Sequence, residues 1–191
     1  EDTTPTTDEG KSFVLRGGFS LHEPISSVSE AYRNIRTSLL FSAPAGDSRV
    51  IAFTSCNPGE GKTTTVANMG LVMASAGNKV LILDADFHRP RINGVFGIEN
   101  DTGLSEVLEG TKTLEEVVHH IEVGGREVEN LHIVPAGPEA ENPAEMLGSQ
   151  RMTDTLEQAK GLYDWVFVDI PPVLFVSDST IISAMCEAVI L

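Results

Sequence analysis

A glycine-rich run with one lysine and two threonines has the composition of a phosphate-binding loop. The run is Pro58-Gly59-Glu60-Gly61-Lys62-Thr63-Thr64, and it follows the apolar segment Val50-Ile51-Ala52-Phe53. Glycines let successive backbone N–H groups turn toward phosphate oxygens, and a helix that begins at Thr63 adds its positive N-terminal end. Lys62 can reach the β and γ phosphates, and the Thr63 hydroxyl can ligate Mg²⁺. The run predicts a nucleoside triphosphate site, although Cys56 stands where the motif G-x-x-x-x-G-K-[ST] has its first glycine.

Two further apolar runs end in aspartate. Val80-Leu81-Ile82-Leu83 leads into Asp84-Ala85-Asp86, and Trp165-Val166-Phe167-Val168 leads into Asp169-Ile170-Pro171-Pro172. The carboxyl ends of parallel strands form one edge of a sheet, and ligands bind at that edge. A single aspartate at a strand end is more often a turn former or helix cap. Three strands that end together, one at the loop and two at carboxylates, instead indicate a Mg²⁺ site.

The rest of the chain alternates apolar runs with helical spacings. We expect helices from Ser27 to Phe41, Thr63 to Gly77, Gly103 to Leu108, Leu114 to Ile121 and Asn142 to Leu156, and further strands at Leu131–Val134 and Ala188–Leu191. His119 and His120 are expected to diverge on the fourth helix and to face solvent. The alternation predicts an α/β fold, a P-loop NTPase-like parallel sheet with helices on both faces in three αβα layers.

Length and charge narrow the class of protein. The 191 residues suit one domain, and 41% of them are hydrophobic, enough for a substantial core. The formal net charge of −15 argues against a nucleic acid or an anionic membrane surface as partner, because both need clustered Lys and Arg. Cys56 and Cys186 lack metal-ligand spacing, which favours reduced thiols in a cytosolic protein. The sequence contains no apolar run of transmembrane length.

Taken together, these motifs resemble the cytoplasmic kinase domain of the bacterial tyrosine kinases (BY-kinases) of capsular and exopolysaccharide biosynthesis. The resemblance runs from about Pro24 to Leu191. The family's phosphate loop P-G-E-G-K-[ST] is matched at 58–63, and its apolar run that ends in Asp before Pro-Pro is matched at 166–172. Its Asp-x-Asp-x-Arg motif is matched at Asp84 and Asp86, but His88 takes the place of the arginine and Arg89 follows it.

The first expected helix carries a further match to this family. Glu30-x-x-Arg33-x-x-Arg36 is similar to the family's E-x-x-R-x-x-R motif, which joins neighbouring protomers into a closed ring in known members. Alone, a Glu and an Arg three residues apart on a helix are more often a surface pair. Beside the three nucleotide-site motifs, they predict a ring-shaped homo-oligomer such as an octamer.

The resemblance implies a division of the chain into three segments. Residues 1–23 are rich in Thr, Asp, Glu and Pro near their start and are expected to form a flexible leader or linker. Residues 24–46 would form the N-terminal helix with the oligomerisation motif, and residues 47–191 the P-loop nucleotide-binding kinase domain. Because a compact domain rarely ends in a core strand, we expect a C-terminal part of this domain to be missing after Leu191.

The resemblance also implies the reaction, which is transfer of the ATP γ-phosphoryl group to tyrosine, autophosphorylation included, with Mg²⁺. Lys62 would stabilise the β and γ phosphates, Thr63 and Asp84 would hold the metal, and Asp169 would anchor its water. A tyrosine with an unperturbed pKa of about 10 is unreactive at neutral pH. Asp86 is therefore expected to orient or deprotonate the tyrosine hydroxyl. His88 either does that work instead or is a solvated neighbour.

Substrate, partners and location follow from the resemblance alone. The chain has only Tyr32 and Tyr163, both expected to be structural, so the substrate tyrosines belong to a C-terminal tail or to other proteins. Expected partners are other copies of the chain, a membrane polysaccharide co-polymerase or activator segment, fused or separate, and a cognate tyrosine phosphatase, with no nucleic acid. The expected location is the inner face of the bacterial plasma membrane.

Two other functions remain open at this point. One is an ATPase switch of the division-site or partitioning kind, in which ATP drives dimerisation. Such proteins usually carry an extra lysine early in the phosphate loop, where this chain has Asn57 and Pro58. The other is a catalytically silent nucleotide-binding module that controls assembly of a polysaccharide-export machine. The intact nucleotide-site residues argue against complete silence, but His88 and the missing C-terminal tail keep this alternative open.

Overall fold

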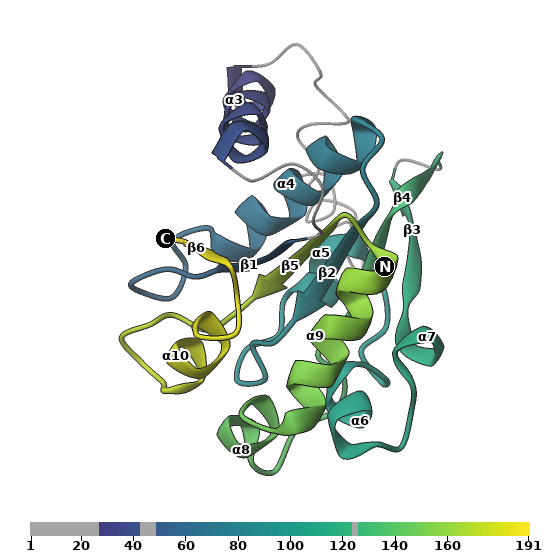
Figure 1. Cartoon of the computed structure of the whole chain (residues 1–191), viewed down its shortest axis with the longest axis vertical. Coiled ribbons are helices and arrows are strands. Elements are labelled where there is room, and N and C mark those ends of the chain that lie inside the picture. The colour runs from purple at the N-terminus through teal and green to yellow at the C-terminus, as the bar shows by residue number, and fades with distance from the viewer. Residues whose placement is uncertain (1–26, 43–48, 124–125) are drawn as a thin grey trace, which may run out of the picture.

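The structure is a computed structural model that describes residues 27–42, 49–123 and 126–191. Its centre is a six-stranded sheet in the order β3-β4-β2-β5-β1-β6 (Figure 1). The strands are β1 (Arg49–Phe53), β2 (Val80–Asp84), β3 (His119–Val123), β4 (Arg126–Val134), β5 (Trp165–Asp169) and β6 (Ala188–Ile190). All neighbours pair in parallel except β3, which runs antiparallel to β4. The predicted α/β fold is confirmed, with this one antiparallel edge as a correction.

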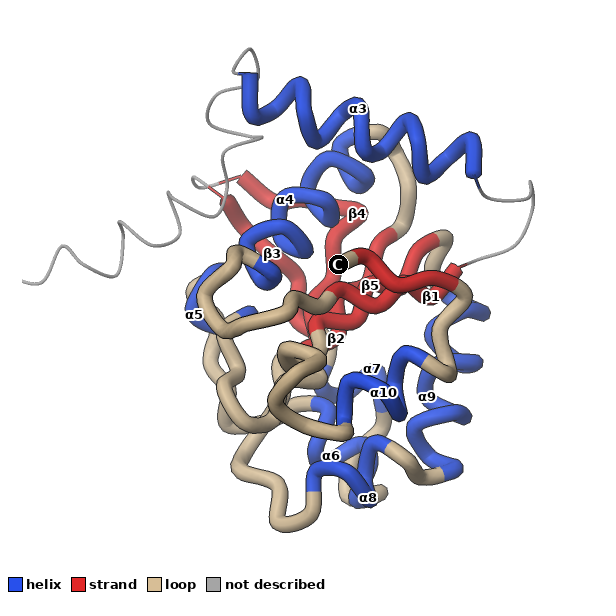
Figure 2. Tube along the Cα trace, turned by 90° about the vertical axis from the view of Figure 1, so that its left-hand side faces the viewer, coloured by secondary structure: helices blue, strands red, loops and turns tan. Residues whose placement is uncertain are grey.

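Helices cover both faces of the sheet (Figure 2). On one face lie α4 (Lys62–Ser75) and α5 (Ile92–Phe96), and α3 (Ser27–Ser42) packs on α4 from outside. On the other face lie α6 (Leu104–Glu109), α7 (Leu114–Val117), α8 (Pro143–Leu147), α9 (Gln150–Leu162) and α10 (Asp178–Ser183). This arrangement gives the three layers that the sequence predicts.

The three central strands are buried on both faces because nearly all of their residues are apolar. Alternate side chains point to opposite faces, as the pleat requires. Ile51, Ile82 and Phe167 belong to the core cluster beneath α4, whereas Leu81 and Val166 belong to the cluster beneath α9. Two separate cores therefore hold the sheet rigidly between the helical layers.

The strand order brings the three predicted motifs to one edge. β5 lies between β1 and β2, and Asp169 is the register partner of both Phe53 at the end of β1 and Asp84 at the end of β2. The phosphate loop after β1 and the two aspartate motifs consequently meet at the carboxyl ends of adjacent strands.

The expected helix from Leu114 to Ile121 is wrong in its second half. A single turn, α7, ends at Val117, and Val118 is extended at φ −74° and ψ 129°. His119 and His120 lie on strand β3, where Ile121 is buried and the His120 ring contacts the His132 ring at a centroid distance of 4.4 Å. β-Branched residues and an available partner strand outweigh the helical spacing here.

The expected helix from Asn142 to Leu156 is two helices. Gly148 ends α8, and the Ser149 side chain accepts a hydrogen bond from the Met152 backbone N–H at 3.3 Å, which begins α9. A serine in extended conformation at a helix start satisfies one of the free N–H groups there. Gly148 therefore ends one helix and Ser149 begins the next, and the chain changes direction between the two helices.

The remaining expectations for the elements divide into confirmed and untested ones. The helix near 27–41, the short helix at Gly103 and the strands at 131–134 and 188–191 are all present, and each end agrees to within five residues. The leader proposed for residues 1–23 lies outside the described residues, and the three-segment division stays a prediction. Among the described helices, none is both long enough and apolar enough to cross a bilayer.

Gly103 offers a test of the close packing beside α6. A Cβ at this position would run into the backbone of Pro135, Ala136 and Gly137. We expect Gly103→Ala to lower the free energy of unfolding by about 3 kcal/mol, because backbone cannot move aside as a flexible side chain can. Gly161→Ala, in α9 with open space around it, should instead raise it by about 0.5 kcal/mol. Equal urea midpoints for the two variants would contradict the packing argument.

Candidate nucleotide and phosphoryl-transfer site

The loop between β1 and α4 has the conformation of a phosphate cradle. Gly59 and Gly61 have φ of 85° and 95°, left-handed values that side chains disfavour, and the space beside both is open. The Glu60 carboxylate accepts hydrogen bonds from the Asn57 backbone N–H at 3.0 Å and side-chain amide at 2.9 Å. These bonds close the loop and leave its glycines at the N-terminus of the 14-residue helix α4.

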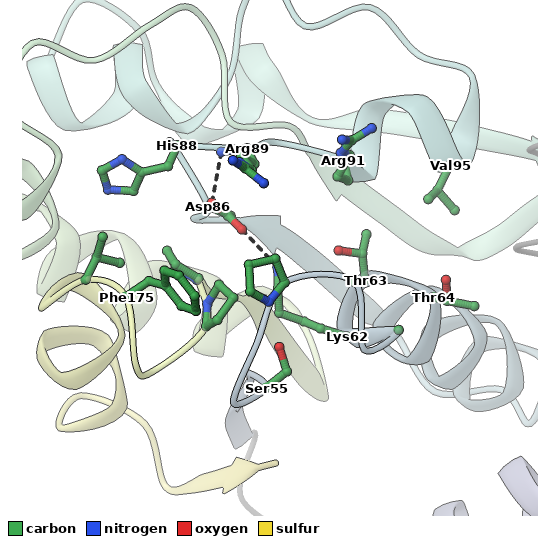
Figure 3. Close-up of a pocket in the computed structure, with 16 residues that line it drawn as sticks. Ser55, Lys62, Thr63, Thr64, Asp86, His88, Arg89, Arg91, Val95 and Phe175 are labelled. Atoms are coloured by element: carbon green, nitrogen blue, oxygen red, sulfur yellow. Dashed lines mark hydrogen bonds and ion pairs between the residues drawn. The ribbon is translucent and has the colours of Figure 1, made fainter.

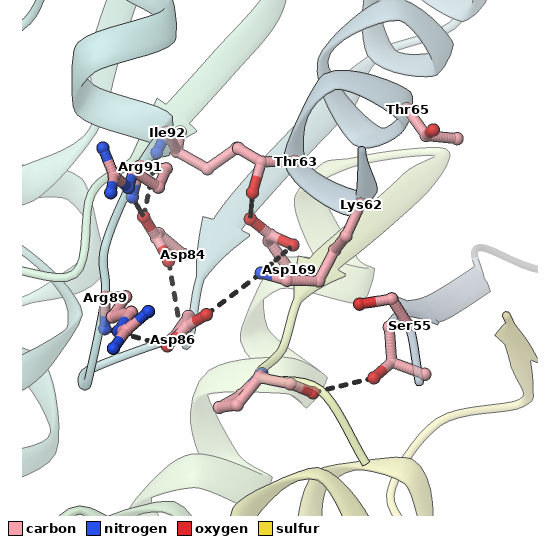
Figure 4. Close-up of polar contacts among 12 residues, drawn as sticks. Ser55, Lys62, Thr63, Thr65, Asp84, Asp86, Arg89, Arg91, Ile92 and Asp169 are labelled. Atoms are coloured by element: carbon pink, nitrogen blue, oxygen red, sulfur yellow. Dashed lines mark hydrogen bonds and ion pairs between the residues drawn. The ribbon is translucent and has the colours of Figure 1, made fainter. Parts of the chain in front are cut away.

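Lys62 joins two of the predicted carboxylates. Its Nζ donates to Asp169 Oδ1 at 2.9 Å and to Asp86 Oδ2 at 3.1 Å (Figure 4). Thr63 Oγ1 donates to Asp169 Oδ2 at 2.8 Å. Asp169 has no exposed surface and the Lys62 side chain is 9% exposed. The structure thus gathers these four residues at one point, at the end of the sheet.

Asp84 lies beside this group but faces a different set of partners. Its Oδ2 accepts the backbone N–H groups of Arg91 and Ile92, both at 3.1 Å, and its Oδ1 accepts that of Asp86 at 3.1 Å. The Thr63 hydroxyl bonds Asp169 instead. Asp84 therefore holds the segment after β2 in place, and its Oδ1 keeps one lone pair for a further partner.

Burial sets the protonation of these groups. Burial, together with the Asp169 carboxylate, raises the pKa of Asp84 to about 8, against the opposing effect of its backbone N–H bonds. Burial also raises the pKa of Asp169, although Lys62 and Thr63 act to lower it. For Lys62, burial alone would lower the pKa, but the carboxylates of Asp169 and Asp86 outweigh it and raise the pKa. The lysine is a fixed cation, whereas Asp84 and Asp169 resist ionisation.

A cavity of about 710 Å³ opens over this group (Figure 3). It is bounded by the phosphate loop, by the segment from Asp86 to Val95 and by the segment from Pro171 to Val176. The third wall is fixed because the Pro171 carbonyl accepts hydrogen bonds from the Thr54 hydroxyl at 2.7 Å and the Ser179 hydroxyl at 2.6 Å.

His88 is not simply solvated. Its Nε2 lies 2.9 Å from Oδ2 of Asp178, a carboxylate at the start of α10 that is 4% exposed, while the His88 side chain is 44% exposed at the cavity wall. This contact ties the segment after β2 to the one after β5. No local pattern could indicate this contact, since the two residues are 90 positions apart.

Sequence reasoning also missed part of the cavity wall. Arg91, Val95 and Phe175 line the cavity although none belongs to a predicted motif. Phe175 follows the Pro-Pro pair by three residues and is 62% exposed. An aromatic residue placed just after a motif at the edge of a sheet is the indication that could have identified it.

The oligomerisation motif lies apart from the cavity, on α3. Glu30 and Arg33 form an ion pair at 2.7 Å within the helix, as the simple surface interpretation expects. Arg36 differs, because its Nε is buried and has no hydrogen-bond partner among the described residues. The motif's role between protomers stays a prediction.

The residues present fit a magnesium nucleotide. In the structure Lys62 uses the Asp86 and Asp169 carboxylates as its anionic partners, and phosphate oxygens have the same hydrogen-bonding chemistry. The open space beside Gly59 and Gly61 lets phosphate approach the loop backbone. Thr63 and Asp169 supply the hard oxygen ligands that Mg²⁺ prefers, directly or through water.

Comparison with known proteins finds relatives that share one named function. A family model described as an AAA domain matches residues 48–191. The chain is 36% identical to the tyrosine-protein kinase YwqD of Bacillus subtilis, over 94% of this chain and 74% of that protein. It is also 36% identical to the tyrosine-protein kinase Etk of Escherichia coli K12, over 85% of this chain but only 22% of that protein.

Solved structures agree with these relatives. The kinase domain of E. coli Etk superposes with a TM-score of 0.83 at 31% identity, over 99% of this chain and 69% of that one. The septum site-determining protein MinD of Pyrococcus horikoshii, in complex with Mg-ADP, gives 0.62 at 25% identity, over 74% of this chain and 56% of that one. One solved structure of this fold is thus a complex with Mg-ADP.

Proposed function

The chain belongs to the family of bacterial tyrosine-protein kinases, and from this we propose that it transfers the γ-phosphoryl group of ATP to tyrosine hydroxyls. The membership confirms the resemblance found in the sequence. The observation that carries the proposal for this chain is the pairing of Lys62 with both Asp86 and Asp169 at the start of α4. This pairing puts one fixed cation and two carboxylates where the terminal phosphates of the nucleotide would lie.

The proposed roles follow from these positions. Lys62 and the backbone N–H groups of the loop would bind the β and γ phosphates. Mg²⁺, held by Thr63, Asp84 and Asp169, would neutralise charge that develops on the phosphates. Asp84 would contribute through Oδ1, the oxygen with a free lone pair.

Asp86 is proposed to face the incoming tyrosine. It is buried, lies at the cavity, and has Oδ2 on Lys62 and Oδ1 on the Arg89 backbone N–H at 3.0 Å. When phosphate takes over Lys62, Oδ2 becomes available to the tyrosine hydroxyl. The hydroxyl oxygen then forms a bond to the γ-phosphorus, the bond to the β–γ bridging oxygen breaks, ADP leaves, and the phenolic proton passes to a carboxylate or to solvent.

The alternative of an ATPase switch is not favoured. An additional lysine early in the loop would be needed at Asn57 or Pro58, and Asn57 is instead bonded to Glu60. The kinase relatives also match more of the chain, and at higher identity, than MinD does.

Partners and location are proposed from the relatives. The chain matches nearly three quarters of YwqD but about a fifth of Etk. The matching region therefore makes up most of one relative and a small part of the other. We propose that it acts in capsule or exopolysaccharide biosynthesis at the inner face of the plasma membrane. Its proposed partners are a co-polymerase or activator segment, fused or separate, and a tyrosine phosphatase.

The proposal is tested by detecting phosphotyrosine directly. The protein is incubated with Mg-ATP and a tyrosine-rich acceptor peptide, and both are examined by mass spectrometry. We expect phosphotyrosine that requires Lys62, with Lys62→Met as the control. Release of phosphate or tight ATP binding without phosphotyrosine would instead favour the ATPase switch or the silent module.

Ring formation is tested on α3. We propose that Arg33 and Arg36 join neighbouring protomers, since Arg36 has a buried Nε without a partner in the described part of one chain. Arg33→Ala with Arg36→Ala should convert the oligomer to monomers, measured by light scattering. An unchanged mass would exclude this role. Arg151→Ala, on α9 of the opposite helical layer, is the matched control and should keep the mass of the oligomer.

A further inference from the structure

Two of the four basic side chains that line the cavity have carboxylate partners. Lys62 pairs with Asp86 and Asp169, and His88 pairs with Asp178. These two residues therefore already have partners, Lys62 at the proposed phosphate site and His88 at the cavity wall. The other two basic residues are arginines.

Arg89 and Arg91 form no ion pair with any residue in the ranges 27–42, 49–123 and 126–191. Both are exposed and both line the cavity (Figure 3). Their backbones are nevertheless fixed, because the Arg89 N–H donates to Asp86 at 3.0 Å and the Arg91 N–H donates to Asp84 at 3.1 Å (Figure 4). Pro90 between them restricts the chain further. Two guanidinium groups are thus presented from a rigid segment.

The charge of the chain makes this pair unusual. The sequence has 28 acidic residues and 13 Lys and Arg, yet within the described part of the chain the guanidinium groups of these two arginines form no ion pair. A guanidinium binds carboxylates and phosphates through paired N–H groups, and it remains charged at any physiological pH. The arrangement calls for an anionic ligand from outside the domain.

The nucleotide phosphates have ligands of their own. Lys62, the loop amides and the N-terminus of α4 lie at one end of the cavity, with Thr63 and Thr64. Figure 3 shows Asp86 between these residues and an end bounded by His88 and Phe175. That far end has an exposed aromatic ring, which suits the ring of a tyrosine. The acceptor would approach Asp86 from there.

We propose that Arg89 and Arg91 select acceptor segments in which acidic side chains flank the tyrosine. This inference rests on the proposed kinase function and adds the class of substrate. Figure 3 shows Arg89 next to Asp86 and Arg91 farther from Phe175, above Thr63. Phe175 would pack on the tyrosine ring while acidic side chains farther along the segment reach the two guanidinium groups. A net charge of −15 alone predicts the reverse, a preference for basic peptides. The two explanations therefore give opposite results.

The test compares peptides that differ only in flanking charge. One has glutamates around a single tyrosine, and the other has lysines at the same positions. The unmodified protein should phosphorylate the acidic peptide with the higher kcat/KM. Arg89→Glu with Arg91→Glu should lower kcat/KM for the acidic peptide by about tenfold, should raise it for the basic one, and should leave KM for ATP unchanged.

Lys79→Glu combined with Arg151→Glu is the matched control, because it makes the same change in net charge away from the cavity lining. An equal loss in this control would show a general charge effect and overturn the proposal. So would equal use of both peptides by the unmodified protein. A rise in KM for ATP with unchanged peptide preference would assign the arginines to the nucleotide phosphates instead.

Measurements of peptide binding test this proposal independently of the proposed reaction. Peptides with phenylalanine in place of tyrosine cannot be phosphorylated, and their dissociation constants are measured by calorimetry with a non-hydrolysable ATP analogue and Mg²⁺. Tighter binding of the acidic peptide that depends on both arginines supports the subsite even where no phosphotyrosine forms. Absence of that preference overturns it even where the kinase is active.

Discussion

Replacing Lys62 with methionine is expected to reduce phosphotyrosine formation by about a thousandfold or more. The ammonium group contacts Asp86 and Asp169 and is proposed to move onto the β and γ phosphates. Methionine has similar length without charge, so the loop can keep its shape while charge neutralisation is lost. Single-turnover kinetics with the acidic peptide measure the effect. A loss below tenfold would mean that Lys62 does not stabilise the transferred phosphoryl group.

The same substitution should destabilise the nucleotide-free protein. Asp169 has no exposed surface, and it would lose its cationic partner. Removing one partner of a buried pair leaves an uncompensated charge, and we expect the free energy of unfolding at pH 8 to fall by about 3 kcal/mol. Lys79→Met, which replaces an exposed lysine, should lower the free energy of unfolding by less than about 0.5 kcal/mol.

The loss should depend on pH with a definite sign. The pKa of Asp169 is raised by burial and that of Asp84 is raised to about 8, so the folded state holds protons that the unfolded chain has released. Their contribution to stability is present below the unfolded value of 3.8 and is lost as pH rises through the folded values. Lys62 opposes the shift at Asp169. Urea titrations should therefore show a smaller cost of Lys62→Met at pH 5 than at pH 8, and equal costs would contradict the argument.

Asp86→Asn should reduce transfer by about a hundredfold to ten-thousandfold while ATP affinity changes little. The amide keeps the size of the side chain, and its oxygen can still accept the Arg89 N–H. It loses the negative charge that is proposed to orient or deprotonate the tyrosine hydroxyl. Binding of a fluorescent ATP analogue and transfer to peptide are measured on the same preparation. Transfer at the unmodified rate would refute the role of Asp86.

Asp169→Asn provides the contrast. Asp169 accepts from both Lys62 and Thr63, whereas an amide would place an NH₂ group against one of these donors. We expect weaker binding of Mg-ATP as well as lost transfer. If the two asparagine variants behaved alike, the proposed division between a metal-anchoring carboxylate and an acceptor-facing one would be wrong.

The sequence predicted the fold and the meeting of the motifs well because both depend on local patterns. Apolar runs of four or five residues that end in Asp84 or Asp169 are short for helices and typical of buried strands, and the carboxyl ends of parallel strands share an edge. The position of Lys62 and Thr63 follows from the glycine-rich loop before a helix. These features need no knowledge of distant contacts.

Other features could not be read in this way. The contact of His88 with Asp178 is one of them, because no local pattern pairs residues of different loops. The strand that begins at His119 competes with a helical spacing, and pairing with β4 decides the outcome. The motif predicts Asp84 as a metal ligand, which stays a prediction, but it does not show that the Asp84 oxygens also accept the backbone N–H groups of the segment that follows. Each of these features depends on a tertiary partner that the local pattern does not contain.

The position of β5 between β1 and β2 affects the order in which the protein folds. Lys62 and Asp169 are 107 residues apart in sequence, and they meet only after β5 has inserted between strands that precede it in the chain. Contacts of such long range form late and slow the folding of a chain. Partly folded chains that lack β5 cannot assemble the phosphate site. Nucleotide would therefore bind only the completed sheet, and by mass action it would favour that state during synthesis.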